Sequence, residues 1–349
     1  MIDWILLLGI LPLGLSSSGI LACNLFFLIK NFRYLYNYKI SKFELLSSAY
    51  IVAYPIVLSL ALKYLFNTDI NLFQLLRKSA PLIIAFLIYF TILSNKEILT
   101  SFRENINSIL GLIFIIFVTS FTLSKELYSH QLQSSDNRFF IYSTSFFLLA
   151  TFIEIRKKNT ALMHLIPLIT FSKVILAYYL FLIFFLKKIT KTTKLFLTSL
   201  LFIGLVKALP RITLFIKSGD GERARGIMQA LPQCFESLTA FLFGHGIGYK
   251  YNIETFPIFS TSNFKLLDNL QYDIHNFYVD TLFKNGFLYL IFYLFFIFYL
   301  SKKVNNKLMS FSILFYFFLS SLSAPTLIGS VEIVGFFLVL ALLRNQNEH

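Results

Sequence analysis

The chain has 349 residues, of which 57% are hydrophobic, 18% aromatic and only 14% charged. Soluble domains are about 45–50% apolar and about a quarter charged, so this composition excludes a soluble enzyme, a nucleic-acid-binding protein and a disordered chain. The net charge of +14 and the mean hydropathy of +0.72 instead predict a membrane protein whose basic loops lie beside anionic lipid.

The apolar residues form helix-length runs, as a bilayer core about 30 Å thick requires, and they do not alternate as in an outer-membrane barrel. We predict an all-α, polytopic integral membrane protein with about 10–12 transmembrane helices and one large extracytoplasmic loop. The first run lacks a basic leader and contains Pro12-Leu13-Gly14, so we expect a retained helix with a kink, or a tight hairpin. The candidate spans lie near 4–29, 43–62, 79–94, 106–123, 139–155, 160–186, 195–216, 276–300, 308–323 and 327–343.

Basic clusters in the loops mark the cytoplasmic side of a membrane protein. The clusters at 156–158 and 187–194 flank the single apolar stretch 160–186, and one crossing would place these two clusters on opposite sides of the membrane. A hairpin that turns at Ser172-Lys173 would keep both clusters cytoplasmic and bring Lys173 near the outer face; the alternative is that one basic loop violates the rule. The clusters are Lys30/Arg33/Lys39/Lys42, Arg156/Lys157/Lys158, Lys187/Lys188/Lys191/Lys194 and Lys302/Lys303/Lys307.

Residues 217–275 form the one long hydrophilic excursion, and the alternation of loops places it outside the cytoplasm, opposite the C-terminus. It is the only loop large enough to fold over a site. We therefore divide the chain into N-terminal transmembrane helices, 1–155, and a region expected to carry the chemistry, 156–349.

Two arginines in this loop are candidates for binding phosphate. Arg223 and Arg225 lie in a flexible approach, 218–226, to a short amphipathic helix predicted at 227–235. Arginine stays charged, and its planar fork of donors fits phosphate. The alternative is that both arginines only solvate the loop or touch lipid headgroups.

Gly244-x-Gly246-x-Gly248 predicts a turn that approaches another group closely, but no strand and helix frame it as in a dinucleotide fingerprint. His275 lies where the loop ends and an apolar helix begins, and an imidazole can accept a proton from a hydroxyl. Most single histidines at a membrane interface do no chemistry. Neither His245 nor His275 has partners at metal-ligand spacing, so we expect no metal.

Four features occur in order along the chain: Phe171-Ser172-Lys173; an arginine before Met228-Gln229-Ala230-Leu231; the run 244–249; and Asp273-Ile274-His275-Asn276-Phe277-Tyr278 followed by Gly286. Together they resemble the signature of the O-antigen ligase and O-antigen polymerase superfamily, over roughly residues 160–300. The chain departs from that pattern at Met228, where an aromatic residue is usual, and at Lys173, where arginine is common.

The resemblance implies a metal-independent, inverting glycosyltransferase that uses an undecaprenyl-diphosphate-linked oligosaccharide as donor and needs no cofactor. It implies His275 as the catalytic base, and Arg225, Arg223 and Lys173 as the residues that bind the donor diphosphate. It also implies a supporting loop, made of Gly244, His245, Gly246, Gly248 and Asn276.

The resemblance favours a polymerase of O-antigen or another surface polysaccharide, because the chain is short and idiosyncratic outside the loop. An O-antigen ligase that delivers the glycan to lipid A-core shares the same motifs and remains the alternative. A polysaccharide flippase or other transporter is the alternative of another class, but it would place charges within many helices, whereas most charges here lie in loops.

The expected location is the bacterial inner (cytoplasmic) membrane, with many crossings and the active site facing the periplasm. The expected partners, all in lipopolysaccharide biosynthesis, are the lipid-linked glycan, an acceptor glycan or lipid A-core, membrane lipids, a flippase and a chain-length regulator. No nucleic acid is expected.

Overall fold

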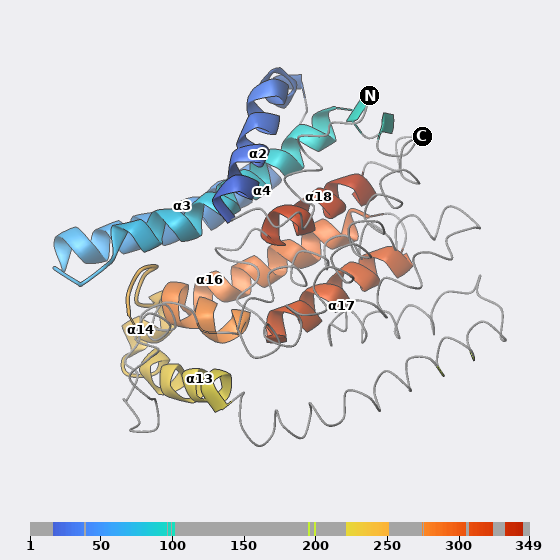
Figure 1. The fold of residues 1–349 in the computed structure, drawn as a ribbon. Helices are drawn as coiled ribbons and strands as arrows, with labels where there is room; N and C mark the ends of the chain where they lie inside the picture. The colour runs from blue at the N-terminus through green and yellow to red at the C-terminus, as the bar shows by residue number, and fades with distance from the viewer. Residues whose placement is uncertain are drawn as a thin grey trace, which may run out of the picture.

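The structure is a computed structural model that describes residues 17–37, 40–95, 97–98, 100–101, 195, 199, 221–250, 274, 276–304, 307–323 and 332–344. Every regular element within these residues is a helix, which confirms the predicted all-α class over this part of the chain (Figure 1). The elements are α2 (Ser17–Asn31), η1 (Phe32–Asn37), α3 (Lys42–Leu65), α4 (Leu72–Ser94), α13 (Gly221–Cys234), α14 (Leu238–Phe243), α16 (Phe277–Lys302), α17 (Lys307–Ser323) and α18 (Glu332–Arg344).

Three of the described helices, α3, α4 and α16, are long and apolar enough to cross a membrane. Shorter apolar helical segments run from Met309 to Phe318 and from Ile333 to Arg344. The chain is therefore a membrane protein by length and composition of its helices. The predicted total of about 10–12 spans, and the proposed hairpin at Ser172-Lys173, fall largely on residues outside the described ranges.

Two predicted boundaries are wrong. Helix α4 begins at Leu72 and not near residue 79, because the side-chain oxygen of Asn71 caps it by accepting a hydrogen bond from the Gln74 amide at 3.2 Å. Arg77 and Lys78, which look like the end of a loop in sequence, therefore lie inside the helix. Residues 221–226, expected to be a flexible approach, form the first turns of α13.

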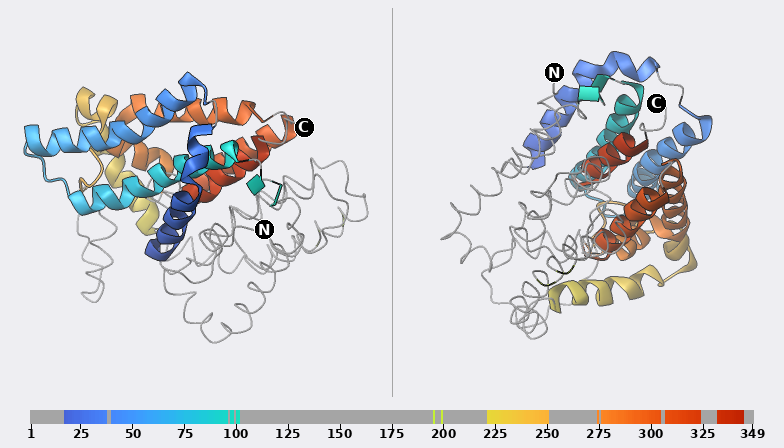
Figure 2. Two further views of the ribbon diagram at one scale, coloured as in Figure 1. Left: turned by 90° about the horizontal axis from the view of Figure 1, so that it is seen from above. Right: turned by 90° about the vertical axis from the view of Figure 1, so that its right-hand side faces the viewer.

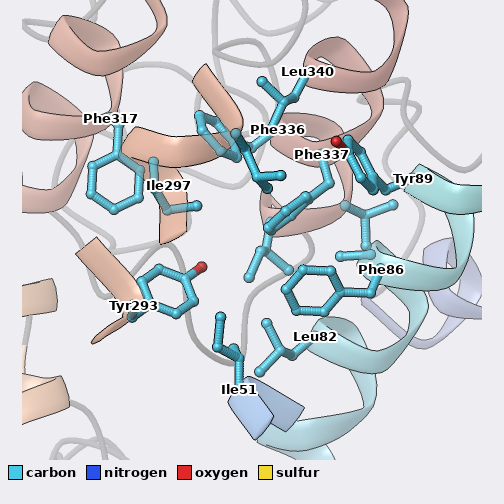
Figure 3. Packing of buried hydrophobic residues seen from close by; sticks show 14 of the residues in the cluster. Ile51, Leu82, Phe86, Tyr89, Tyr293, Ile297, Phe317, Phe336, Phe337 and Leu340 are labelled. Carbon is cyan, nitrogen blue, oxygen red and sulfur yellow. The ribbon is translucent and has the colours of Figure 1, made fainter. Parts of the chain in front are cut away.

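The core forms where α4, α16, α17 and α18 meet, with Ile51 of α3 at its edge (Figure 3). Aromatic rings fill it: the Phe86 and Phe337 ring centroids are 4.5 Å apart, and those of Phe317 and Phe336 are 5.7 Å apart. Edge-on and tilted contacts of this kind stabilise packed aromatic side chains. The high phenylalanine content of the sequence thus serves helix–helix packing in this region.

A proline inside α3 explains how this helix is joined to α16. Pro55 has no N–H, so the carbonyl of Ile51 four residues earlier loses its helical partner. The hydroxyl of Tyr289 on α16 donates to that carbonyl at 2.9 Å. The Tyr289 side chain is fully buried, and this bond fixes α16 against α3 at the break in the helical ladder.

The helices have two distinct ends. At one end, the Phe43 and Tyr299 rings are 4.8 Å apart, and Arg344 contacts both the Glu44 carboxylate, at 2.9 Å, and the Tyr89 hydroxyl, at 2.8 Å. We call this the basic end, because the described lysines of the 302–307 cluster also lie there, at the end of α16 and the start of α17. At the opposite end, the loop end, α3 turns into α4, and α13 and α14 lie beside the start of α16 (Figures 1 and 2).

Candidate functional site

The glycine turn, residues 244–248, docks onto a break in α16. Gly286 has φ 78° and ψ 173° and interrupts the helix, so the carbonyls of Phe283 and Lys284 are released from the helical ladder. The backbone amides of His245 and Gly246 donate to these two carbonyls, each at 2.8 Å. The turn thus supplies the hydrogen bonds that the broken helix has lost.

Two glycines make this contact possible by letting the backbones touch. A Cβ placed on Gly244 would lie 2.5 Å from the carbonyl carbon of Lys284, and a Cβ on Gly286 would collide with the carbonyl of Leu242. Both glycines also have positive φ, 80° and 78°, a conformation that disfavours any other residue. The glycines that the sequence singles out therefore serve close packing of backbone on backbone.

The other side of the glycine turn is held by α3 and the start of α4. The Ile247 amide donates to the Ser59 hydroxyl at 2.7 Å, and the Asn71 amide donates to the carbonyl of Gly248 at 3.1 Å. The Tyr54 hydroxyl donates to the carbonyl of Phe243 at 3.3 Å. The turn therefore joins the loop end of three membrane-spanning helices.

His245 has a packing role. Its Nε2 lies 3.1 Å from the carbonyl of Gln233, which can only accept, so Nε2 carries the proton. Its ring stacks on Tyr249 at 5.1 Å and lies 4.7 Å from Phe283. The supporting role that the resemblance implies for His245 in a catalytic loop stays a prediction.

The junction between loop and α16 is fixed on both sides of residue 275. The Asn276 side chain caps α16 by accepting hydrogen bonds from the amides of Tyr278 and Val279, at 3.0 and 3.1 Å. The buried carboxylate of Asp280 accepts from the amide of Ile274 at 3.1 Å. His275 itself lies outside the described residues, but its two neighbours are held against the start of the helix.

The other implied site residues are placed only in part. Arg223 and Arg225 belong to the first turns of α13, which packs against α16, but their side chains are outside the described part of the structure, as is Lys173 altogether. Helix α13 buries Ala230 and Cys234, as expected for an amphipathic helix. The structure therefore places the glycine turn against the break in α16 and Asn276 at the start of the same helix, and the positions of the arginine side chains stay a prediction.

Charged residues buried inside the spans are the feature that the sequence interpretation missed. Asp280 and Lys284, one turn apart on α16, form an ion pair at 2.5 Å, and each is 2% exposed. Lys78 on α4 is 5% exposed and interacts electrostatically with both members of the pair. The signal was present in the sequence: two opposite charges four residues apart interrupt the apolar run 276–300.

Two uncharged polar side chains lie next to this pair on α16. Thr281 and Asn285 are both fully buried, and in the described structure neither the threonine hydroxyl nor either atom of the asparagine amide has a hydrogen-bond partner. The four residues occupy adjacent rows on two helical turns. We call Asp280, Thr281, Lys284 and Asn285 the polar face of α16.

The described residues contain no group of three His, Cys, Asp or Glu side chains that could hold a metal ion. No protein-family model matches the sequence, and searches among curated proteins and solved structures also gave no match. The features of the described structure that bear on function are therefore the glycine turn, the fixed junction around residue 275 and the buried charges.

Proposed function

We propose that this chain is a bacterial inner-membrane glycosyltransferase that polymerises O-antigen or another surface polysaccharide from undecaprenyl-diphosphate-linked repeat units. The fixed loop–helix junction carries the proposal. Asn276 and Asp280 hold the backbone on both sides of residue 275 at the start of α16. A general base has to be held within hydrogen-bond reach of its substrate, and a pinned backbone at the membrane boundary supports such a placement.

In the proposed reaction, His275 accepts the proton of an acceptor hydroxyl as the hydroxyl oxygen bonds to the anomeric carbon of the donor sugar. The bond between that carbon and the diphosphate oxygen breaks, and undecaprenyl diphosphate leaves with the electron pair. Attack from the face opposite the leaving group inverts the anomeric configuration. Arg225, Arg223 and Lys173 stabilise the departing negative charge in this proposal.

The experiment is in vitro transfer with a purified lipid-linked donor and the full-length protein in detergent. We expect His275→Ala to abolish donor consumption while leaving the amount of protein in the membrane unchanged. His349→Ala, far from the loop and from α16 in the sequence, is the matched control and should keep full activity. Near wild-type elongation by His275→Ala would overturn the assignment of the base.

The acceptor decides between polymerase and ligase. A polymerase lengthens the glycan on its lipid carrier, so the wild-type protein should form longer lipid-linked chains without any added lipid A-core. A ligase should be inactive until lipid A-core is supplied. Product length by gel electrophoresis separates the two outcomes.

One observation favours transport as a second candidate function. Lys78, Asp280 and Lys284 are ionisable residues buried within apolar helices, and such residues often mark the path of a transported group. A transporter would move a lipid-linked glycan across vesicle membranes without consuming it. Donor consumption by the purified protein in the assay above would exclude pure transport.

A further inference from the structure

We infer that α14 and the glycine turn form a re-entrant segment, which enters the half of the bilayer at the loop end and contacts lipid acyl chains there. Phe235, Leu238 and Phe243 present its apolar surface; their side chains are 44–73% exposed, and we call them the apolar corner. The sequence places this part of the chain in a hydrophilic loop outside the membrane. The inference concerns membrane contact and does not depend on the proposed reaction.

The first step is continuity with the exposed apolar side of a membrane-spanning helix. Beyond the break at Gly286, the apolar side chains on one side of α16 are 38–54% exposed: Phe287, Leu288, Ile291, Phe295 and Phe298. The ring of Phe241 on α14 stacks on Phe287, and the ring of Phe235 stacks on Phe241, with centroids 5.0 and 5.2 Å apart. The surface that α16 presents to lipid therefore continues onto the apolar corner.

The second step is depth, measured from the basic end along two helices. At 1.5 Å per residue, Phe287 lies about 22 Å along α16 from Lys302. Tyr54, which donates to the carbonyl of Phe243, lies about 18 Å along α3 from Lys42. Counted from one edge of a hydrocarbon core about 30 Å thick, both heights place α14 about 8–12 Å below the opposite edge. A tilt of the helices lowers both heights and moves α14 closer to the middle of the core.

The third step is the state of the backbone. Non-helical chain at membrane depth is tolerated only where its polar groups have partners within the protein. The Gly244 amide donates to the carbonyl of Ala240 at 2.8 Å. The amides of residues 245–247 donate to the two released carbonyls of α16 and to the Ser59 hydroxyl. The glycine turn therefore meets the requirement that hydrocarbon imposes on a re-entrant chain.

One charged residue restricts how the segment can lie. Glu236, between Phe235 and Leu238, is exposed. A carboxylate in hydrocarbon is costly, so Glu236 should lie at the level of the headgroups and α14 should run inward from its start to Phe243. The six residues of α14 span about 9 Å, which agrees with the depth obtained from α3 and α16.

The test is depth-dependent quenching of tryptophan fluorescence in the full chain, reconstituted in phosphatidylcholine nanodiscs. Trp4 is the one tryptophan of the sequence, so Trp4→Phe provides a background without tryptophan. In that background, Phe243→Trp should lose at least about half of its emission when the lipid is brominated in the middle of its acyl chains. Leu238→Trp should be quenched most by lipid brominated close to the headgroup.

Phe295→Trp and Lys250→Trp are the matched controls. Phe295 lies on the exposed side of α16 and calibrates quenching by brominated lipid, whereas Lys250 follows the glycine turn and should be quenched only by aqueous iodide. Quenching of Phe243→Trp by iodide to the extent seen for Lys250→Trp would overturn the inference. Insensitivity of Phe243→Trp to both quenchers would also overturn it, because protein would then cover the apolar corner: another part of this chain, a second copy or a partner.

A second reporter avoids any disturbance of α14 by the larger tryptophan ring. Leu238→Cys and Lys250→Cys, each combined with Cys23→Ser, carry a nitroxide that collides with oxygen in lipid and with a nickel chelate in water. The ratio of oxygen to nickel collisions should be higher for Leu238→Cys, and equal ratios would overturn the inference. Neither measurement uses glycan transfer, so the re-entrant segment and the proposed function fail separately.

Discussion

Gly286 and Gly246 both have positive φ, 78° and 87°, but different atoms surround them. A methyl group on Gly286 would have backbone atoms of Leu242 and Phe243 as its nearest neighbours, whereas the nearest neighbours of one on Gly246 would be side-chain atoms of Leu62, Ser59 and Ile70, at 3.1–3.3 Å. We expect Gly246→Ala to cost about 1–2 kcal/mol of unfolding free energy from its φ alone. Gly286→Ala should cost clearly more, because backbone cannot move aside as a side chain can.

Thermal unfolding in detergent, followed by the loss of monodisperse protein after heating, measures this difference. The midpoint for Gly286→Ala should lie below that for Gly246→Ala. Identical midpoints would show that φ alone matters and that the contact between α14 and the break in α16 is loose.

Cys234 should be an unreactive thiol. It is buried on α13, and burial raises its pKa from 9.0 to about 12, so almost no thiolate forms at neutral pH. Because the folded state holds this proton more tightly, the stability that it contributes is complete below about pH 9 and is lost as the pH rises toward 12.

Maleimide labelling of a Cys23→Ser variant, in which Cys234 is the only cysteine, measures this protection. Labelling at pH 7 should be negligible in the native protein and complete after denaturation in SDS. Rapid labelling of the native protein would show that α13 separates from α16 in solution.

In the caps of α16 and α3 alike, a side-chain oxygen accepts a hydrogen bond from a backbone amide. The two caps should nevertheless differ in their effect on activity. Asn276 caps α16 next to residue 275, and Ser41 caps α3 at the basic end by accepting from the Glu44 amide at 3.2 Å. Loss of either cap should cost about 0.5–2 kcal/mol of unfolding free energy. Only Asn276→Ala should also reduce glycan transfer, by tenfold or more, since only this cap positions the proposed base.

The measurements are the thermal midpoint and the initial rate of donor consumption for Asn276→Ala and Ser41→Ala. A parallel fall of activity in both variants would mean that Asn276 contributes stability only.

Helix positions followed from local sequence where a run of about 20 residues is predominantly apolar. The predicted spans 43–62, 276–300 and 308–323 each match a helix closely. The start of α4 was missed because Arg77 and Lys78 resemble loop residues. The carboxylate that attracts the Lys78 ammonium group, that of Asp280, lies on α16, about 200 residues away in sequence, and no local pattern reveals it.

The distribution of charge between the two ends of the molecule predicts its orientation. Lys42, Lys302, Lys303 and Lys307 are at the basic end, opposite the glycine turn. Since loops on the cytoplasmic side carry an excess of lysine and arginine, the glycine turn and residues 217–275 should face the periplasm.

Cysteine labelling in whole cells tests this orientation. In a background without Cys23, Lys250→Cys and Lys173→Cys should react with a membrane-impermeant maleimide, and Lys303→Cys should react only after the membrane is opened. Protection of Lys173→Cys together with labelling of Lys250→Cys would rule out the hairpin at Ser172-Lys173 and keep the rest of the topology.

The part of the candidate site that could be predicted from the sequence is the glycine turn, because its backbone geometry requires glycine. Glycines at 244, 246 and 248 predict a turn, because glycine is the residue that best tolerates the positive φ values and close backbone contacts of such a turn. The surface that receives the turn was not predictable. It is formed by Ser59 and the released carbonyls of α16, which acquire a partner only once the whole chain has folded.

The bond between Tyr289 and Ile51 has a consequence for biosynthesis. These residues are 238 positions apart, so at about 5–20 residues per second a ribosome delivers Tyr289 roughly 10–50 s after Ile51. During that interval the carbonyl of Ile51, which has no helical donor because of Pro55, is in the membrane before the Tyr289 hydroxyl that donates to it has been synthesised. Insertion chaperones would have their longest opportunity to hold α3 during this time, and chains that terminate before α16 should be prime substrates for membrane proteases.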